Sequence, residues 1–186
     1  TVSAILKKSS DSITVNFVAD VSTAKLAELV VTMDYSVADG STANTLRVRV
    51  TDAFGNTLAG QTVSVLADNG ATTAPTVITE PDGTVEISVT SQTAGVSAVT
   101  ASINSSSQSR NVTFVADVRT AQIADLVVIK DGSEADGATA NTLRARVTDA
   151  FCNSLHGQTV SVLADNCATV AQKFTTQPDG TVEIAV

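Results

Sequence analysis

The sequence predicts an all-β protein, because its composition, its alternation and its turns all favour strands. Ala, Val, Thr and Ser dominate, whereas Trp is absent and Tyr occurs once. β-Branched side chains fit a pleated strand better than a helix, where their χ1 rotation is restricted. Apolar and polar residues alternate with a period of two, as in Leu46–Val50. Turn pairs such as Asp39-Gly40 and Asn69-Gly70 separate the alternating segments.

The chain repeats itself with a spacing of 97 residues, so that Phe17 recurs as Phe114 and Asp39-Gly40 as Asp136-Gly137. A unit of this length can enclose its own core, unlike solenoid repeats of roughly 20 to 50 residues. We expect three parts. Residues 1–20 are the C-terminal strand or strands of a preceding repeat, residues 21–117 are a complete repeat, and residues 118–186 are a second repeat without its last strands.

Each complete repeat is expected to hold seven short strands. They are placed, for the first copy, at residues 26–34, 44–53, 61–67, 75–79, 84–91, 96–103 and 109–116. The second copy should hold a strand at 158–164. Seven antiparallel strands in about 97 residues predict an immunoglobulin-like sandwich of two sheets. Since there is no Cys-Trp-Cys core, its interior must be Val, Leu, Ile and Phe.

The junction between repeats predicts a rod. The segment Ala19–Lys25 recurs as Ala116–Gln122, and neither copy contains Gly or Pro. Flexible tethers are rich in Gly and Ser, so we expect an extended segment that passes directly from one sheet into the next. The sandwiches should line up with restricted bending and add about 35 Å each, at about 3.3 Å per strand residue.

Charge and motifs exclude several functions. The net charge of −8 and the single basic pair, Lys7-Lys8, argue against nucleic-acid binding. No apolar run has the roughly 18 residues of a membrane span, so direct membrane insertion is not expected. The one histidine, His156, replaces Ala59 and has no recurring catalytic partner, so we expect neither an enzyme nor a cofactor. Acidic residues beside Gly or Asn are interpreted as turn residues rather than calcium ligands.

Two segments differ most between the copies: residues 32–37, with counterparts 129–134, and residues 73–78, with counterparts 170–175. Between residues 18–89 and 115–186, 21 of 72 positions differ, and many changes fall together. The candidate ligand or interdomain contacts are therefore Pro75, Thr76, Val77 and Ile78, with their counterparts Gln172, Lys173, Phe174 and Thr175. Relaxed constraint on loops explains the same pattern, because loops tolerate change.

Cys152 and Cys167 stand where the first copy has Gly55 and Gly70. An intradomain disulfide is disfavoured, because a straight strand between them would separate the cysteines by roughly 25 Å, beyond the limit of about 7 Å between Cα atoms. Free thiols, intermolecular links and engineered labels remain as alternatives.

The ordered turn motifs carry a family resemblance. Ala38-Asp39-Gly40, Phe54-Gly55-Asn56, Gly60-Gln61-Thr62 and Asn69-Gly70 resemble the first class of bacterial immunoglobulin-like domain, found in tandem in intimin and invasin adhesins. The resemblance implies a Gram-negative cell-surface protein with an outer-membrane anchor at one end, a rod of such domains and a host-surface receptor. Two hypotheses follow: a stalk that projects a binding tip, or a binding module that contacts a host protein, a glycan or a neighbouring adhesin.

The chain also predicts self-association. Residues 118–186 should expose unpaired strand edges, which invite strand exchange. We expect residues 1–17 of one molecule to fill the gap in a second molecule, head to tail.

Overall fold

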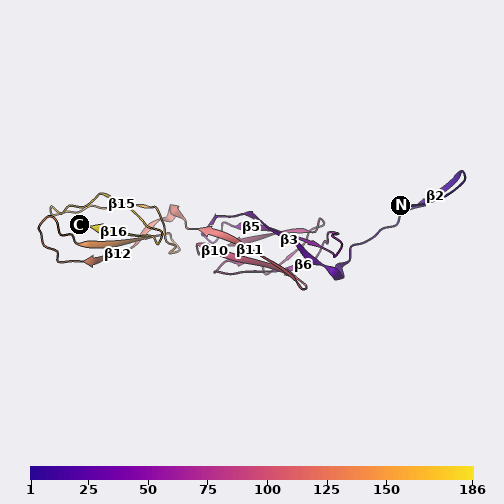
Figure 1. The fold of residues 1–186 in the computed structure, drawn as a ribbon, viewed down its shortest axis with the longest axis horizontal. Helices are drawn as coiled ribbons and strands as arrows, with labels where there is room; N and C mark the ends of the chain where they lie inside the picture. The colour runs from indigo at the N-terminus through magenta and orange to yellow at the C-terminus, as the bar shows by residue number, and fades with distance from the viewer.

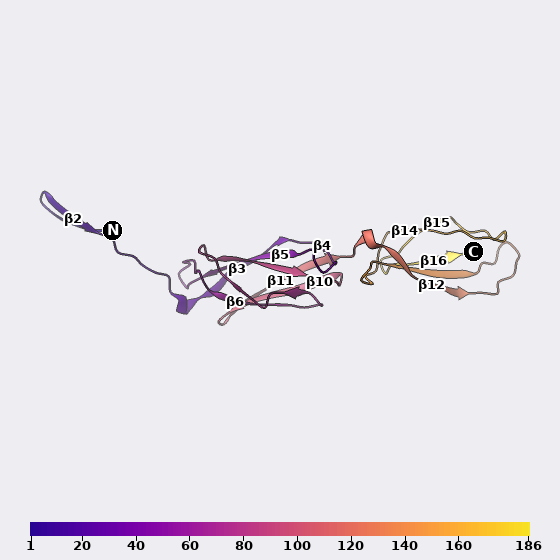
Figure 2. The same ribbon diagram turned by 180° about the vertical axis from the view of Figure 1, so that it is seen from behind.

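The structure, a computed structural model, describes all residues from Thr1 to Val186. Two β-sandwiches follow one another along a single line, and a small hairpin lies at the N-terminal end (Figures 1 and 2). The first sandwich therefore lies between the hairpin and the second sandwich. No helix is long and apolar enough to cross a membrane. The predicted fold class, an all-β rod of tandem immunoglobulin-like sandwiches, is confirmed.

The first sandwich consists of two sheets whose strands are mostly antiparallel. One has the strand order β3 (Lys25–Met33), β5 (Asn44–Thr51), β9 (Thr84–Thr90) and β7 (Thr72–Thr73). The other has the order β4 (Ser36–Val37), β11 (Ser106–Val115), β10 (Gly95–Ile103), β6 (Thr62–Ala67) and β8 (Thr76–Ile78). All seven strands predicted for this copy are present. The two-residue strands β4 and β7 were not predicted, because two residues carry no alternation.

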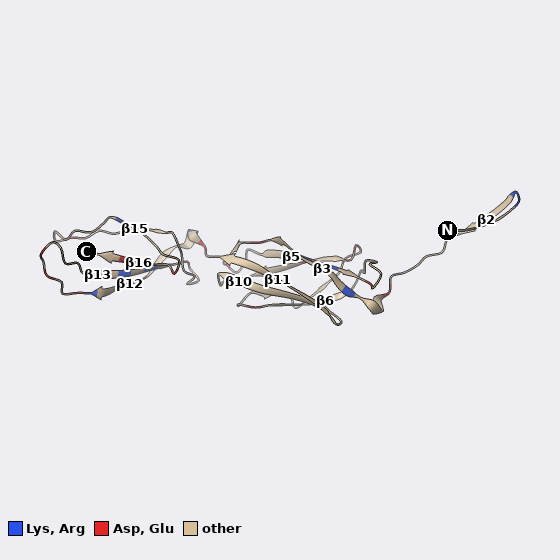
Figure 3. Ribbon diagram, in the orientation of Figure 1, with Lys and Arg blue, Asp and Glu red and all other residues tan.

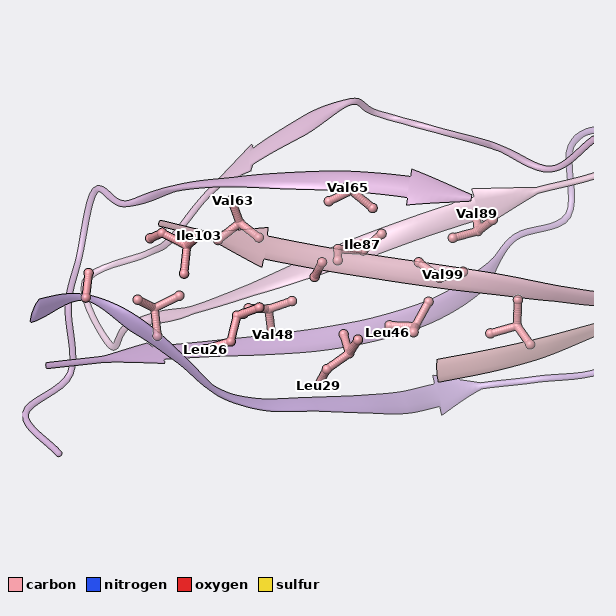
Figure 4. Packing of buried hydrophobic residues seen from close by; sticks show 14 of the residues in the cluster. Leu26, Leu29, Leu46, Val48, Val63, Val65, Ile87, Val89, Val99 and Ile103 are labelled. Atoms are coloured by element: carbon pink, nitrogen blue, oxygen red, sulfur yellow. The ribbon is translucent and has the colours of Figure 1, made fainter. Parts of the chain in front are cut away.

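The inward faces of these sheets form one core of 17 buried residues. Figure 4 shows Leu29, Leu46 and Val48 from one sheet facing Val63, Val65 and Val99 from the other. Phe114 on β11 is the largest fully buried side chain. Each Val, Leu or Phe buried in this way contributes about 1.5–3 kcal/mol, so the period-two pattern holds the two sheets together.

The second sandwich is smaller. One sheet has the order β12 (Gln122–Lys130), β13 (Thr142–Thr148) and β16 (Thr181–Ala185), and β14 (Thr159–Ser161) pairs with β15 (Lys173–Thr175). Its core holds six buried residues. The strand predicted at 158–164 is wrong in its extent, since β14 ends at Ser161. In the first copy, residues Ser64–Ala67 of β6 are held by β10, and no such strand lies beside residues 161–164.

Residues 1–13 form a separate hairpin of β1 (Val2–Leu6) and β2 (Ser9–Ile13). Its register reproduces that of β10 and β11 at the 97-residue offset. Val2 pairs with Ile13 as Val99 pairs with Arg110, and Leu6 pairs with Ser9 as Ile103 pairs with Ser106. The hairpin is fully exposed and packs on neither sandwich.

The junctions are turns rather than extended segments, so that prediction is wrong. A single 3-10 turn, η1 (Val21–Thr23) or η2 (Val118–Thr120), enters each sandwich. The Asp before each turn accepts a hydrogen bond from a backbone N–H within it, from Ser22 to Asp20 and from Arg119 to Asp117. This is the capping chemistry that Asp supplies at the start of a helical turn.

Candidate functional site: the joint between the two sandwiches

The second sandwich presents a loop at the joint that is organised by the carboxylate of Asp149. This residue is fully buried at the end of β13. Its Oδ1 accepts hydrogen bonds from the backbone N–H groups of Phe151 and Asn153, both at 2.9 Å. Its Oδ2 accepts one from Asn153 Nδ2 at 2.8 Å. The loop is therefore shaped around one carboxylate.

Burial and hydrogen bonding act in opposite directions on Asp149. Burial raises the pKa of its carboxyl group, but the hydrogen bonds from Asn153, Asp117 and Phe151 together lower the pKa below its ordinary value of 3.8. The carboxylate is therefore ionised at neutral pH and accepts all of these bonds.

The chain entering the second sandwich docks on the same carboxylate. The backbone N–H of Asp117 donates to Asp149 Oδ2 at 3.1 Å, and Asp117 is itself buried. Thr120 Oγ1, at the end of η2, accepts from the backbone N–H of Ala150 at 3.2 Å. Arg119 Nε lies 3.0 Å from Asp117 Oδ1, but the guanidinium is largely exposed, so this ion pair adds little. The turn and the loop thus form one hydrogen-bonded unit.

Asn153 extends from this unit to the first sandwich. Its Oδ1 accepts from the backbone N–H of Ala94 at 2.8 Å, and its Nδ2 donates to the carbonyl of Gln92 at 2.9 Å. Both partners lie in the loop between β9 and β10 of the first sandwich. One side chain therefore links the two repeats through two hydrogen bonds, one on each side of its amide group.

The receiving loop is itself held in shape. Ser91, which is 2% exposed, accepts from the backbone N–H of Thr93 through its Oγ and donates to the carbonyl of Thr93, both at 2.9 Å. The loop is thus prepared to present Gln92 and Ala94 to Asn153. Pre-ordered groups lose less conformational entropy when they form a contact.

The first sandwich carries the same loop at its N-terminal end. Asp52 Oδ2 accepts from the backbone N–H of Asp20 at 3.1 Å and from Asn56 Nδ2 at 2.8 Å. The hydrogen bond from the Asn56 side chain, aided by those from the backbone, holds the pKa of Asp52 at about 2. Asn56 has no hydrogen bond to another repeat here. Asn56 occupies in the first repeat the position that Asn153 occupies in the second.

The structure places the predicted contact segments on strands at the edge of each repeat. Thr76–Ile78 form β8, the last strand of its sheet, and Lys173–Thr175 form β15. Val77 and Phe174 pack against the cores, whereas Ile78 is 63% exposed. Pro75 and Gln172 precede these strands, and the backbone carbonyl of each accepts a hydrogen bond within its own repeat. The hydrogen bonds that cross the joint come from Asn153 instead. The role predicted for the eight residues stays a prediction.

Cys152 and Cys167 are both free and exposed. Each adopts the left-handed conformation of the glycine it replaces, with φ of 68° and 61°. Cys152 lies in the Asp149 loop, and Cys167 lies in the turn after β14.

The rest of the surface offers few charged groups. Figure 3 shows Lys, Arg, Asp and Glu scattered singly along both sandwiches. No three His, Cys, Asp or Glu side chains converge in a way that could hold a metal ion.

Sequence reasoning missed Asn153 and Asp149 as a site. The signal was available, because Asp-Ala-Phe-x-Asn occurs unchanged in both copies at 52–56 and 149–153. On sequence alone this motif indicates a turn, and Asp149 does hold a turn in the structure. The contact with the neighbouring repeat follows only from how the two sandwiches meet.

The fold and the joint define a tandem array of immunoglobulin-like sandwiches, in which specific hydrogen bonds connect one sandwich to the next. The chain belongs to the bacterial Ig-like domain (group 1) family, whose model matches residues 26–115 and 123–186. The resemblance drawn from the turn motifs is thereby confirmed.

Among curated proteins, the chain is similar to the inverse autotransporter adhesin YeeJ of Escherichia coli (strain K12). The two are 31% identical over 187 residues, which is 95% of this chain and 8% of that adhesin. Among solved structures, the D0-D1 domain of intimin gives a TM-score of 0.46 at 20% identity, covering 87% of this chain and 84% of that one. Invasin, a bacterial integrin-binding protein, gives 0.45 at 28% identity, covering 88% and 33%.

Proposed function

We propose that this chain is a segment of the stalk of a bacterial surface adhesin, which holds a binding tip away from the outer membrane. The observation that carries the proposal is the joint, where Asn153 binds Gln92 and Ala94 across the two repeats. A connection that fixes orientation has a use in a spacer, since a stiff array of given length reaches farther than a flexible one.

The repeat boundaries proposed for this function are 1–20, 21–117 and 118–186, with a joint after Asp20 and after Asp117. Each joint uses the same Asp carboxylate, at Asp52 or Asp149, to hold the entering chain. We place the protein at the cell surface, anchored to the outer membrane through a part of the adhesin beyond this segment. Its role is mechanical, without catalysis or a cofactor.

Deletion tests the stalk directly. Removing residues 21–117 from the whole adhesin joins Asp20 to Val118, so that Asp20 takes the place of Asp117 at the Asp149 carboxylate. Adhesion should be retained while the distance between cell and target surface, measured by electron microscopy, shrinks by one repeat. Loss of adhesion that is not restored by an unrelated rigid spacer of equal length would contradict the proposal.

A second candidate function is adhesion through the edge strands β8 and β15. The observation in its favour is that these exposed edges carry different residues in otherwise similar repeats. An open strand edge can bind an extended segment by adding a strand. The partner would be a host protein, a glycan or a neighbouring adhesin. Exchanging Gln172–Thr175 for Pro75–Ile78 should abolish binding by the second repeat if this candidate is correct, and should leave adhesion unchanged if the segment is only stalk.

A further inference from the structure

We propose that the first sandwich carries tension along the rod, and that a row of hydrogen bonds between its first and last strands resists the pull. The inference rests on the proposed stalk function, because a stalk between an anchor and a target is pulled along its length when the two move apart. It adds to that function a mechanical role for a defined set of side chains.

Tension reaches the first sandwich through its first and last strands. The chain enters this sandwich through η1 and β3 at one end and leaves it through β11 at the other end (Figures 1 and 2). A pull along the rod therefore drives β3 and β11 in opposite directions, each along its own axis. Contacts between these two strands are loaded in shear.

The strand that continues β3 is paired directly with β11. β4 lies parallel to the end of β11, where Ser36 pairs with Phe114 and Val37 pairs with Val115. The backbone N–H of Ala38 then donates to the carbonyl of Val115 at 2.8 Å. Hydrogen bonds between strands lie across the strand direction, so a pull along the strands strains them together instead of opening them one by one.

Two side chains reinforce this pairing near the joint. Asn44 is 0% exposed, and its amide group bridges β4 and β11. Its Oδ1 accepts from the backbone N–H of Ser36 at 3.0 Å, and its Nδ2 donates to the carbonyl of Thr113 at 2.9 Å. The backbone N–H of Thr113 donates in turn to Asp34 Oδ1 at 2.6 Å. The segment after β3 is thus tied to β11 at several points.

Further hydrogen bonds join the start of β3 to the start of β11. Asn104 Nδ2 donates to the carbonyl of Ala24 at 2.9 Å. The backbone N–H of Leu26 donates to Ser106 Oγ at 3.2 Å, and Gln108 Nε2 donates to the carbonyl of Leu26 at 3.2 Å. Since starts meet starts and ends meet ends, the two strands run side by side in the same direction. The bonded row extends from one end of the sandwich to the other.

Hydrogen bonds suit this role better than apolar packing. Apolar contact is non-directional, so side chains can slide along a core while they stay buried. A hydrogen bond weakens steeply when its distance and angle leave their narrow range. A buried amide such as that of Asn44 is costly unless both of its ends are paired. Here both ends are paired with the backbone of the strands that the pull would separate.

The comparison of the two repeats supports the assignment. Residues 32–37 are one of the two segments that differ most between the copies, yet Asp34 and Ser36 recur as Asp131 and Ser133. The positions that change around them are Thr32, Met33, Tyr35 and Val37. The residues whose side chains or backbone form the bonded row are therefore kept where their neighbours are not.

Unfolding of the full chain at constant force, held by its two ends in optical tweezers, tests the proposal. The first repeat is recognised by its step, since 97 residues at about 3.4 Å each lengthen the chain by roughly 300 Å. Asn44→Ala should shorten the lifetime of this repeat under load by about tenfold or more, because two strained bonds are lost. Asp34→Ala, at a half-buried position, should also shorten it and decides the test if Asn44→Ala does not fold.

Thr79→Ala is the matched control. Thr79 is buried, and its Oγ1 donates to the carbonyl of Leu58 at 2.7 Å and accepts from the backbone N–H of Gln61 at 2.9 Å. These partners lie outside β3, β4 and β11, so their bonds persist when the strained strands separate. Thr79→Ala should lower the urea midpoint about as much as Asn44→Ala, but change the lifetime under load by less than about twofold.

Equal shortening of the lifetime by Thr79→Ala and Asn44→Ala would overturn the proposal, as would an unchanged lifetime in Asn44→Ala or, in its place, Asp34→Ala. Either result would leave the spacer role standing, because that role is measured by the reach of the whole adhesin and not by force.

Discussion

The two repeats share most of their sequence, but the residues of the second reach only to Val186, the counterpart of Val89. Leu29 and its counterpart Leu126 are the same residue on equivalent strands, yet one is 0% and the other 57% exposed. Leu26 is 5% exposed, and its counterpart Ile123 is 59% exposed. The difference lies in the hairpin β10–β11, which covers the first core; the corresponding positions of the second repeat lie beyond Val186.

The comparison teaches that these strands close the core rather than merely extend a sheet. Three strands of the second repeat, β12, β13 and β16, keep the pairing of β3, β5 and β9. The facing sheet is reduced to β14 and β15. The joint, in contrast, is complete, because its residues all lie before the end of β13 or in the loop that follows.

The largest difference should appear when the paired leucines are truncated. Leu29→Ala leaves a cavity in a closed core and should destabilise the first repeat by about 2–5 kcal/mol. Leu126→Ala removes a largely exposed side chain and should cost the second repeat less than about 1 kcal/mol in dilute solution. Urea unfolding followed by NMR signals of each repeat would measure both. Equal costs would show that the second core is closed in solution.

Acid should weaken the first repeat through Asp52. Its pKa is about 2 in the folded chain against an ordinary value of 3.8, so the unfolded chain binds more protons between these pH values. Stability from this group is present above about pH 4 and is lost as the pH falls toward 2. Asp52→Asn should flatten this part of the curve of unfolding free energy against pH. An unaltered slope in Asp52→Asn would contradict the assignment.

The smallest effect concerns the two cysteines. Gly55 and Gly70 adopt positive φ without strain, whereas Cys152 and Cys167 hold the same conformation with a Cβ. Space does not oppose the side chain at these sites, because nothing lies within 4 Å of a Cβ built on Gly55. Cys152→Gly and Cys167→Gly should each stabilise the second repeat by about 0.5–1 kcal/mol. Thermal unfolding of the two variants would measure this gain. A loss of stability in either variant would mean that its thiol makes a stabilising contact.

Sequence patterns predicted much of the fold, because period-two alternation and turn residues are local signals. They placed β5, β9 and β10 within one or two residues of their observed bounds. They failed where pairing decides the structure. β14 is shorter than its sequence predicts, and η2 replaces an extended junction because Asp117 and Thr120 form contacts with a loop about 30 residues away. The hydrogen bonds of Asn153 to Gln92 and Ala94 could not be predicted, because they depend on how the two sandwiches meet and no local sequence pattern encodes that.

The orientation of the two repeats in solution tests the stalk account most directly. Residual dipolar couplings should fit one common alignment tensor for residues 21–117 and 118–186 in the unchanged chain at monomeric concentration. Asn153→Ala removes both hydrogen bonds across the joint, worth about 1–3 kcal/mol together, and should require separate tensors for the two repeats. Asn56→Ala removes the same local bond to Asp52 without touching another repeat, and should still fit one tensor. If Asn153→Ala also fits one tensor, or if the unchanged chain already needs two, the joint does not stiffen the array.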